Sequence, residues 1–155
     1  NTKHGPLKTD HILFIGAGAF HIAKPTDLIP ELQGRFPVHV KLESLTKDDF
    51  EKILTIPENA LTKQYAALLA VDRVMLTFDS SAVSAIAEAA CNANENHEDI
   101  GARRLHAIFE QILEDISFNA GDENMPPFEL VIDEKYVRSH LSGENQTVDI
   151  RKYIL

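Results

Sequence analysis

The chain has 155 residues, of which 44% are hydrophobic and 25% charged, a balance typical of one folded domain or two small ones rather than of a disordered chain. Its 24 acidic residues outnumber 15 basic ones, and the formal net charge of -9 argues against a general nucleic-acid binder. One cysteine, Cys91, excludes an internal disulfide framework, and no apolar run approaches the roughly 20 residues that cross a bilayer. Because no signal-peptide pattern opens the chain, we expect a cytoplasmic protein without a membrane segment.

Two apolar stretches in the first third of the chain predict strands. Residues 11–15 form a continuous apolar run closed by Gly16 and Gly18, which predicts a buried strand of a sheet covered on both faces. Few other segments could pair with it, so we expect most of that sheet to lie before Asn1 in a longer protein. Residues 38–42 alternate apolar with polar side chains, which predicts a half-buried strand.

Prolines separate these two stretches. Pro25, Pro30 and Pro37 leave room only for short helical turns and for a bend at Gly34, which places Arg35 on a turn. An arginine so placed is most often a solvated surface residue, but it can also reach a phosphate bound by a neighbouring subunit. The residues alone do not decide between the two.

From Thr46 the pattern becomes helical, which indicates a domain boundary near residues 42–45 and two domains, 1–43 and 44–155. The spacing of Phe50, Ile53 and Leu54 predicts a first helix. A second helix is predicted from near Pro57. Its apolar face is expected to carry Leu61, Tyr65, Leu68 and Leu69.

The remaining pattern alternates strands with helices. Residues 74–78 predict a strand, after which Asp79 is a candidate N-cap for a helix that runs to about Asn92. One stripe of that helix would hold Val83, Ile86, Ala87 and Ala90. The clearest helix is predicted from about Ile100 to Ser117, because apolar residues recur at helical spacing: Leu105, Ile108, Phe109, Ile112, Leu113 and Ile116. A strand at 128–132 and a short helix at 134–141 complete an α+β fold.

Arg103 and Arg104 are the least expected residues of this pattern. They lie where the helix from about Ile100 begins, and the free N–H groups and positive dipole end of a helix disfavour cations there. Glu98 and Asp99, just upstream, could neutralise them. A bound phosphate could do the same, since the planar donors of arginine suit phosphate oxygens. The residues leave these two explanations about equally open.

Other motifs carry less weight. Gly16-Ala17-Gly18 lacks the third small residue and the long helix of a dinucleotide-binding turn. The seven histidines are scattered, no HExxH motif occurs, and no nucleophile elbow is present, so we expect no metal site. Cys91 is expected to be a small core residue.

Several segments together resemble the HslU (ClpY) family, the AAA+ ATPase subunits of the bacterial HslUV (ClpYQ) protease. The similar segments are residues 2–5, 8–15 and 27–35, the run Ile100-Gly101-Ala102-Arg103-Arg104-Leu105-His106, and the ending Tyr153-Ile154-Leu155. The related ClpX family shares the pattern of residues 100–106, the sensor-2 segment of these ATPases, but not the ending. The resemblance implies the end of an AAA+ α/β domain in residues 1–43 and a helical lid domain with a small sheet in residues 44–155.

The resemblance also implies roles for single residues. Arg103 would be the sensor-2 arginine that contacts ATP phosphates, Glu31 would lie at the edge of the nucleotide site, and Arg35 would be the arginine finger presented to the next subunit of a hexameric ring. Tyr153, Ile154 and Leu155 would dock the HslV peptidase. The full subunit would unfold protein substrates with ATP and magnesium.

The sequence departs from the family in three respects. Ala17 occupies the position where the resemblance implies a hydroxyl-bearing sensor-1 residue, and neither a G-x-x-x-x-G-K-[ST] motif nor a Walker-B Asp-Glu pair is present. We therefore expect the magnesium ligands to lie elsewhere in the full subunit and this chain alone to be inactive. The alternative function is a stand-alone interaction or adaptor domain, and an upstream P-loop in the same reading frame would distinguish the two.

Overall fold

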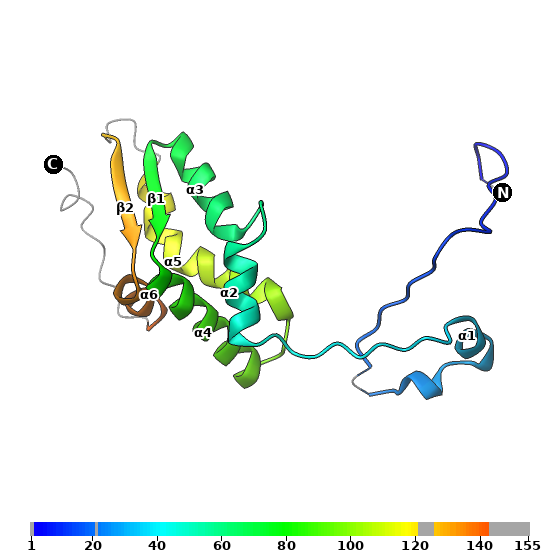
Figure 1. The fold of residues 1–155 in the computed structure, drawn as a ribbon. Helices are drawn as coiled ribbons and strands as arrows, with labels where there is room; N and C mark the ends of the chain where they lie inside the picture. The colour runs from blue at the N-terminus through cyan, green and yellow to red at the C-terminus, as the bar shows by residue number, and fades with distance from the viewer. Residues whose placement is uncertain (1, 21, 121–125, 143–155) are drawn as a thin grey trace. The chain divides into compact units, whose positions relative to one another are not determined.

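The computed structural model describes residues 2–20, 22–120 and 126–142, and the chain divides into two compact units, Asn1–Leu42 and Glu43–Leu155 (Figure 1). Each unit has its own internal contacts. The division falls where proline-rich, largely irregular chain gives way to helices.

The first unit contains two short helical segments, η1 (Pro25–Asp27) and α1 (Pro30–Arg35). Each has a proline in its first turn, where the missing N–H group costs nothing. The Nε2 of Gln33 donates hydrogen bonds to the carbonyl oxygens of Thr26 (2.9 Å) and Leu28 (2.5 Å), which ties α1 to η1. The prediction of short helical turns is confirmed.

The predicted bend at Gly34 is wrong, because Gly34 lies inside α1. The Phe36 N–H donates to the Leu32 carbonyl oxygen at 2.9 Å, so the helical hydrogen bonding spans Gly34. Arg35 is therefore the last residue of a helix rather than part of a bend.

The two strands predicted in this unit are also wrong. Residues 11–15 and 38–42 form no strand, and their apolar side chains are exposed, with Leu13 82% and Val40 78% accessible. A strand forms only when its backbone N–H and C=O groups pair with a neighbour. Within the described part of the chain, neither run finds such a neighbour.

The second unit contains a two-stranded parallel sheet formed by β1 (Val74–Phe78) and β2 (Phe128–Ile132). Val74 pairs with Phe128, and the register continues to Phe78 and Ile132. Side chains alternate between a buried and a more exposed face, as strands covered on one side require. Both predicted strands are confirmed.

The described residues of this unit also form five α-helices, which leave one face of the sheet exposed (Figure 1). They are α2 (Lys47–Thr55), α3 (Leu61–Val71), α4 (Ser80–Asn96), α5 (Arg104–Ala120) and α6 (Glu134–Leu141), with the 3-10 turn η2 (Gly101–Arg103) before α5. α3 packs on β1, α4 contacts α2, α5 and α6, and α5 also contacts α6. The fold is α+β, as predicted.

Side-chain caps explain where three of these helices begin. The Oγ1 of Thr46 accepts a hydrogen bond from the Asp49 N–H, and the Asp49 carboxylate accepts one from the Thr46 N–H, a reciprocal capping box before α2. Asp79 accepts from the Ser80 N–H at the start of α4, which confirms the predicted N-cap. Asp133 accepts from the Tyr136 N–H at the start of α6.

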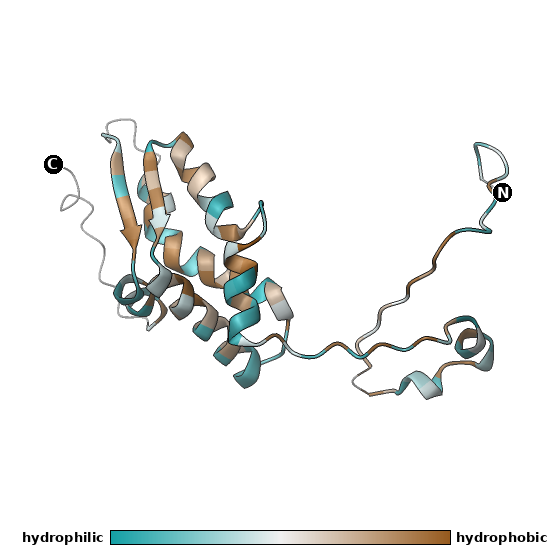
Figure 2. Cartoon of the chain, viewed as in Figure 1, coloured by the Kyte–Doolittle hydropathy of each residue, from teal (hydrophilic) through white to brown (hydrophobic). Residues whose placement is uncertain are grey.

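Helix α5 forms the centre of the core. All six apolar residues predicted for its stripe are buried, together with Ala120. Phe109 stacks on Tyr65 of α3 with ring centroids 5.1 Å apart, and it contacts Phe78 of β1 at 5.5 Å. Figure 2, coloured by hydropathy, shows hydrophobic stretches on the strands and central helices, whereas α6 is mostly hydrophilic.

Some predicted boundaries need correction. α3 begins at Leu61 rather than near Pro57, and Leu68 is 60% exposed because it lies one residue away from the buried Leu69, on another side of the helix. α4 continues to Asn96 instead of ending near Asn92. The side chain of Asn96 donates to the Asn92 carbonyl oxygen at 2.8 Å, so a polar residue is accommodated in the last turn.

Candidate functional site

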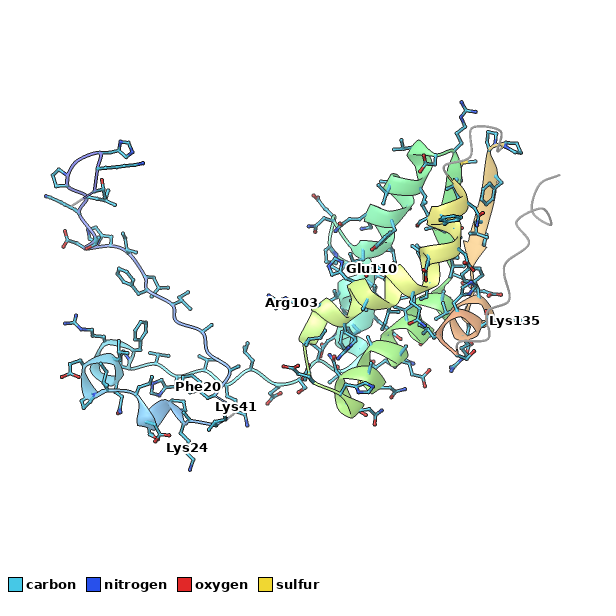
Figure 3. All side chains as sticks on the ribbon, turned by 180° about the vertical axis from the view of Figure 1, so that it is seen from behind. Phe20, Lys24, Lys41, Arg103, Glu110 and Lys135 are labelled. Atoms are coloured by element: carbon cyan, nitrogen blue, oxygen red, sulfur yellow. The ribbon has the colours of Figure 1, made fainter. Side chains whose placement is uncertain are left out.

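Arg103 is the last residue of the η2 turn, immediately before α5. The turn starts at Gly101, whose φ of +60° is a left-handed conformation that favours glycine. Arg103 is exposed, and none of the described residues forms a hydrogen bond or ion pair with its guanidinium. Figure 3 shows Arg103 at the beginning of α5, directed away from the helices. The structure therefore leaves this cation available to an external anion.

Arg104 is bound within the protein. Its Nε donates to Asn94 Oδ1 at 3.0 Å, and its Nη2 donates to the Glu98 carbonyl oxygen at 2.7 Å. Neutralisation by Glu98 and Asp99, the first explanation considered from the sequence, thus applies to Arg104 and not to Arg103. A backbone carbonyl, not the Glu98 carboxylate, accepts the hydrogen bond.

Asp99 belongs to the same connection between α4 and α5. Hydrogen bonds from the Ser44 side chain and the Gly101 N–H lower the pKa of its carboxyl, and the nearby positive charge of Arg104 acts in the same direction. The Gly101 N–H lies 2.9 Å from Asp99 Oδ1. The carboxylate therefore stabilises the turn that presents Arg103.

In the first unit, Glu31 and Arg35 lie in the first and last turns of α1. Both are exposed, and neither forms an ion pair with a described residue. They can therefore meet a ligand or another chain. The structure brings Glu31 and Arg35 together on one short helix, while Arg103 belongs to the other unit.

The predicted docking residues Tyr153, Ile154 and Leu155 lie outside the described residues. Cys91, predicted as a core residue, is half-buried and packs against the core. Burial and the Glu95 carboxylate raise the pKa of its thiol, which opposes reactivity.

The structure also brings Ser139, His140 and Asp115 together, although the sequence contains no motif for them. The Ser139 hydroxyl donates to the Tyr136 carbonyl oxygen at 2.8 Å and lies 3.3 Å from His140 Nδ1. His140 Nε2 is 4.0 Å from Asp115 Oδ2. Because the hydroxyl proton is directed to a carbonyl oxygen, the serine is not activated as a nucleophile. The cluster connects α6 to α5.

Neither a metal centre nor a membrane segment is found in the part of the chain that the structure describes. Across residues 2–20, 22–120 and 126–142, no three His, Cys, Asp or Glu side chains are grouped so that they could hold a metal ion. Among the same residues, no helix combines the length and apolar character that spanning a bilayer requires.

Comparison with known proteins relates the chain to one family. A family model described as the C-terminal, D2-small domain of ClpB protein matches residues 45–119. The ATP-dependent protease ATPase subunit HslU of Persephonella marina is 59% identical over all 155 residues, and the subunits of Desulfotalea psychrophila and Rickettsia rickettsii are each 56% identical over the same length. The chain matches the HslU family along its whole length.

This match confirms the resemblance inferred from the sequence motifs. The chain spans about a third of the HslU subunits that it matches, 34% of the length of each. The small-domain model begins at residue 45 and ends one residue before the end of α5. The second unit, with its helices and small parallel sheet, is thus related to the C-terminal small domain of a AAA+ protein.

Proposed function

We propose that this chain is the C-terminal part of the ATPase subunit of an ATP-dependent protease. Residues 44–155 would form the small lid domain, and residues 1–43 the end of the large α/β domain. The match to HslU over all 155 residues and the small-domain model at residues 45–119 support this proposal. The exposed apolar runs at 11–15 and 38–42 agree with it, since such runs become strands when the rest of a sheet is present.

The proposed nucleotide role rests on one observation: Arg103 is exposed, and no described residue binds its guanidinium. An arginine at the beginning of a helix is unfavourable unless an anion compensates it, and no described residue does so. Its guanidinium has planar donors that suit phosphate oxygens, so Arg103 fits ATP. We infer that Arg103 binds a phosphate of the nucleotide when the lid domain closes.

The nucleotide would supply the phosphoryl group whose hydrolysis drives the subunit, and this chain's residues would orient it. Because the sequence contains no Walker-B Asp-Glu pair, the magnesium ligands would lie in the part of the subunit outside this chain. Glu31 would lie at the edge of the nucleotide site. Arg35, exposed at the end of α1, would reach the nucleotide of the next subunit in a hexameric ring.

The tail would provide the contact with the peptidase. Ile150, Tyr153, Ile154 and Leu155 are large apolar residues that follow a polar run, a pattern typical of a segment that inserts into a groove on a partner. In the HslUV protease, that partner is the HslV peptidase. The full subunit would act in the cytoplasm on protein substrates.

The test of this proposal is the Arg103→Ala change in a full-length subunit. We expect ATP binding or hydrolysis to weaken by about 1.5–3 kcal/mol, the range for hydrogen bonds to charged groups. Nucleotide affinity can be measured by calorimetry and turnover by phosphate release. Lys135→Ala is the matched control, because Lys135 is also an exposed cation of the second unit, on α6 (Figure 3).

Unchanged affinity and turnover in the Arg103→Ala subunit would contradict the proposed nucleotide role. That result would favour the alternative considered from the sequence, a stand-alone adaptor domain. A loss in both Arg103→Ala and Lys135→Ala would indicate a general electrostatic effect rather than a phosphate contact.

A further inference from the structure

The connection between α4 and α5 contains a small network of hydrogen bonds centred on Arg104. Arg104 donates to Asn94 Oδ1 and to the Glu98 carbonyl oxygen, and Asn94 Nδ2 donates in turn to the Gly101 carbonyl oxygen at 3.2 Å. Asn94 thus contacts both ends of η2, its first residue and the residue that follows it.

The η2 turn depends on these polar contacts. None of its three residues is buried, so no apolar side chain within the turn anchors it in the core. The carbonyl of Gly101 is held by Asn94, and its N–H is held by Asp99. The side chain of Arg104 completes the set immediately after Arg103. The backbone that carries Arg103 is therefore fixed on both sides by hydrogen bonds that Arg103 itself does not make.

We propose that Arg104, acting with Asn94, is a positioning residue that directs Arg103 toward the phosphate. This inference rests on the proposed nucleotide role of Arg103. Two donors of Arg104 are occupied by protein acceptors, whereas no described residue binds the guanidinium of Arg103. The two adjacent arginines thus have separate tasks, one holding the turn and the other contacting the ligand.

The geometry explains why arginine, rather than any cation, is suited to the position. The Nε and Nη2 donors of one guanidinium reach two acceptors on different parts of the chain, a side-chain oxygen on α4 and a backbone oxygen after it. A lysine carries a single ammonium group and cannot reproduce this fork. Arg104→Lys should therefore restore only part of the effect of arginine.

A double-mutant cycle in the full-length subunit tests the proposal, with Arg103→Ala, Arg104→Met and the double variant. We expect Arg104→Met to lower kcat/KM for ATP about tenfold, a smaller loss than the roughly 100-fold that a misplacement of about 1 Å can cause. Where Arg103 is already alanine, Arg104→Met should change kcat/KM less than about twofold, because contacts that act through one another are not additive. Asn94→Ala should behave like Arg104→Met, and Arg104→Lys should give an intermediate value.

Arg138→Met is the matched control. Arg138 also joins helices through its guanidinium, with Nη2 2.9 Å from Glu88 Oε2 on α4 and Nε 2.7 Å from Glu134 Oε1, but it lies on α6. This change should leave the KM for ATP unchanged. Melting temperatures of all variants separate loss of folding from loss of positioning, and Asn94→Ala provides an independent test if Arg104→Met does not fold.

The possible results are distinguishable. Independent, additive losses would show that Arg104 contacts the nucleotide itself and would overturn the proposal. A normal kcat/KM in Arg104→Met and Asn94→Ala, beside an impaired Arg103→Ala, would also overturn it while leaving the proposed function intact. If Arg103→Ala itself has no effect, the proposed nucleotide role fails, and the positioning role fails with it.

Discussion

At the scale of single residues, the two adjacent arginines illustrate how local context separates identical side chains. Arg104 is committed to acceptors on Asn94 and Glu98, whereas Arg103 is exposed without a described partner. The sequence shows that both occupy an unfavourable place for a cation, but it contains no signal for Asn94, ten residues before Arg104. A polar side chain near the end of a predicted helix is too common to identify such a contact.

Arg35 leads to a prediction about catalysis. In a full-length subunit, Arg35→Ala should leave ATP affinity nearly unchanged and lower the hydrolysis rate by about 10³-fold or more, because an arginine finger acts mainly in the transition state. Equilibrium nucleotide binding and steady-state turnover measure the two effects separately. Lys41→Ala, which also removes an exposed cation from the first unit (Figure 3), should change neither. Equal losses of binding and turnover in Arg35→Ala would exclude the finger role.

The lowered pKa values of three aspartates predict how the stability of the fold depends on pH. Hydrogen bonds lower the pKa of Asp49, mainly from the Thr46 side chain, of Asp79, mainly from the Ser81 side chain, and of Asp99. Carboxyls with lowered pKa bind fewer protons in the folded than in the unfolded chain. Their stabilisation is therefore present above about pH 4, the ordinary value for aspartate, and is lost as the pH falls through the lower folded values.

We accordingly expect the free energy of unfolding to decrease as the pH is lowered from about 5 to 2. Urea denaturation of this chain at a series of pH values measures the change. Asp79→Asn should reduce the slope, because the amide remains able to cap the helix but does not titrate in this range. An unfolding free energy that stays constant or rises on acidification would contradict the assignment.

At the scale of secondary-structure elements, α5 and the η2 turn show both the success and the failure of periodicity. The apolar spacing from Leu105 to Ile116 identifies the buried face of α5 correctly. It does not locate the start of the helix, which is predicted near Ile100 but lies at Arg104. The left-handed Gly101 and the 3-10 turn intervene, and they are maintained by contacts with α4 that a pattern within one helix does not contain.

The element at the chain end is tested by deletion. A full-length subunit lacking Tyr153–Leu155 should hydrolyse ATP nearly normally but should not stimulate the partner peptidase, since the apolar tail would be its anchor. Peptide cleavage by the peptidase, with intact and shortened subunit, measures the stimulation. Gln146→Ala, in the polar run before the tail, should stimulate like the intact subunit. Equal stimulation by the shortened subunit would show that these residues are not needed for docking.

At the scale of the whole molecule, the two units differ in how complete they are. The second unit contains an extensive core, with Phe50, Ile86, Phe109 and Ile132 among its fully buried side chains. None of the described residues of the first unit is buried. The first unit therefore has the composition of a sheet-forming segment without the packing of one.

The absence of two nucleotide-binding motifs from the sequence predicts that the chain alone does not hydrolyse ATP. The sequence contains neither the phosphate-binding G-x-x-x-x-G-K-[ST] loop nor a Walker-B acidic pair, so it lacks the groups that position the phosphates and the attacking water. Phosphate release by the purified 155-residue chain should equal that of buffer, whereas a full-length subunit in the same assay should be active. Turnover that copurifies with the chain through successive columns would contradict this expectation.

The sequence by itself determined the α+β class, the family resemblance and the elements of the second unit, because helical and strand periodicities there coincide with a core made within the same stretch of chain. The tertiary structure decided what depends on partners distant in sequence. It shows that Asn94 binds Arg104 and not Arg103, and that α5 begins later in the sequence than its apolar spacing predicts. It also left residues 11–15 and 38–42 unpaired. Periodicity reports which side chains prefer burial, but a strand or a bound guanidinium exists only where another part of the chain supplies the matching groups.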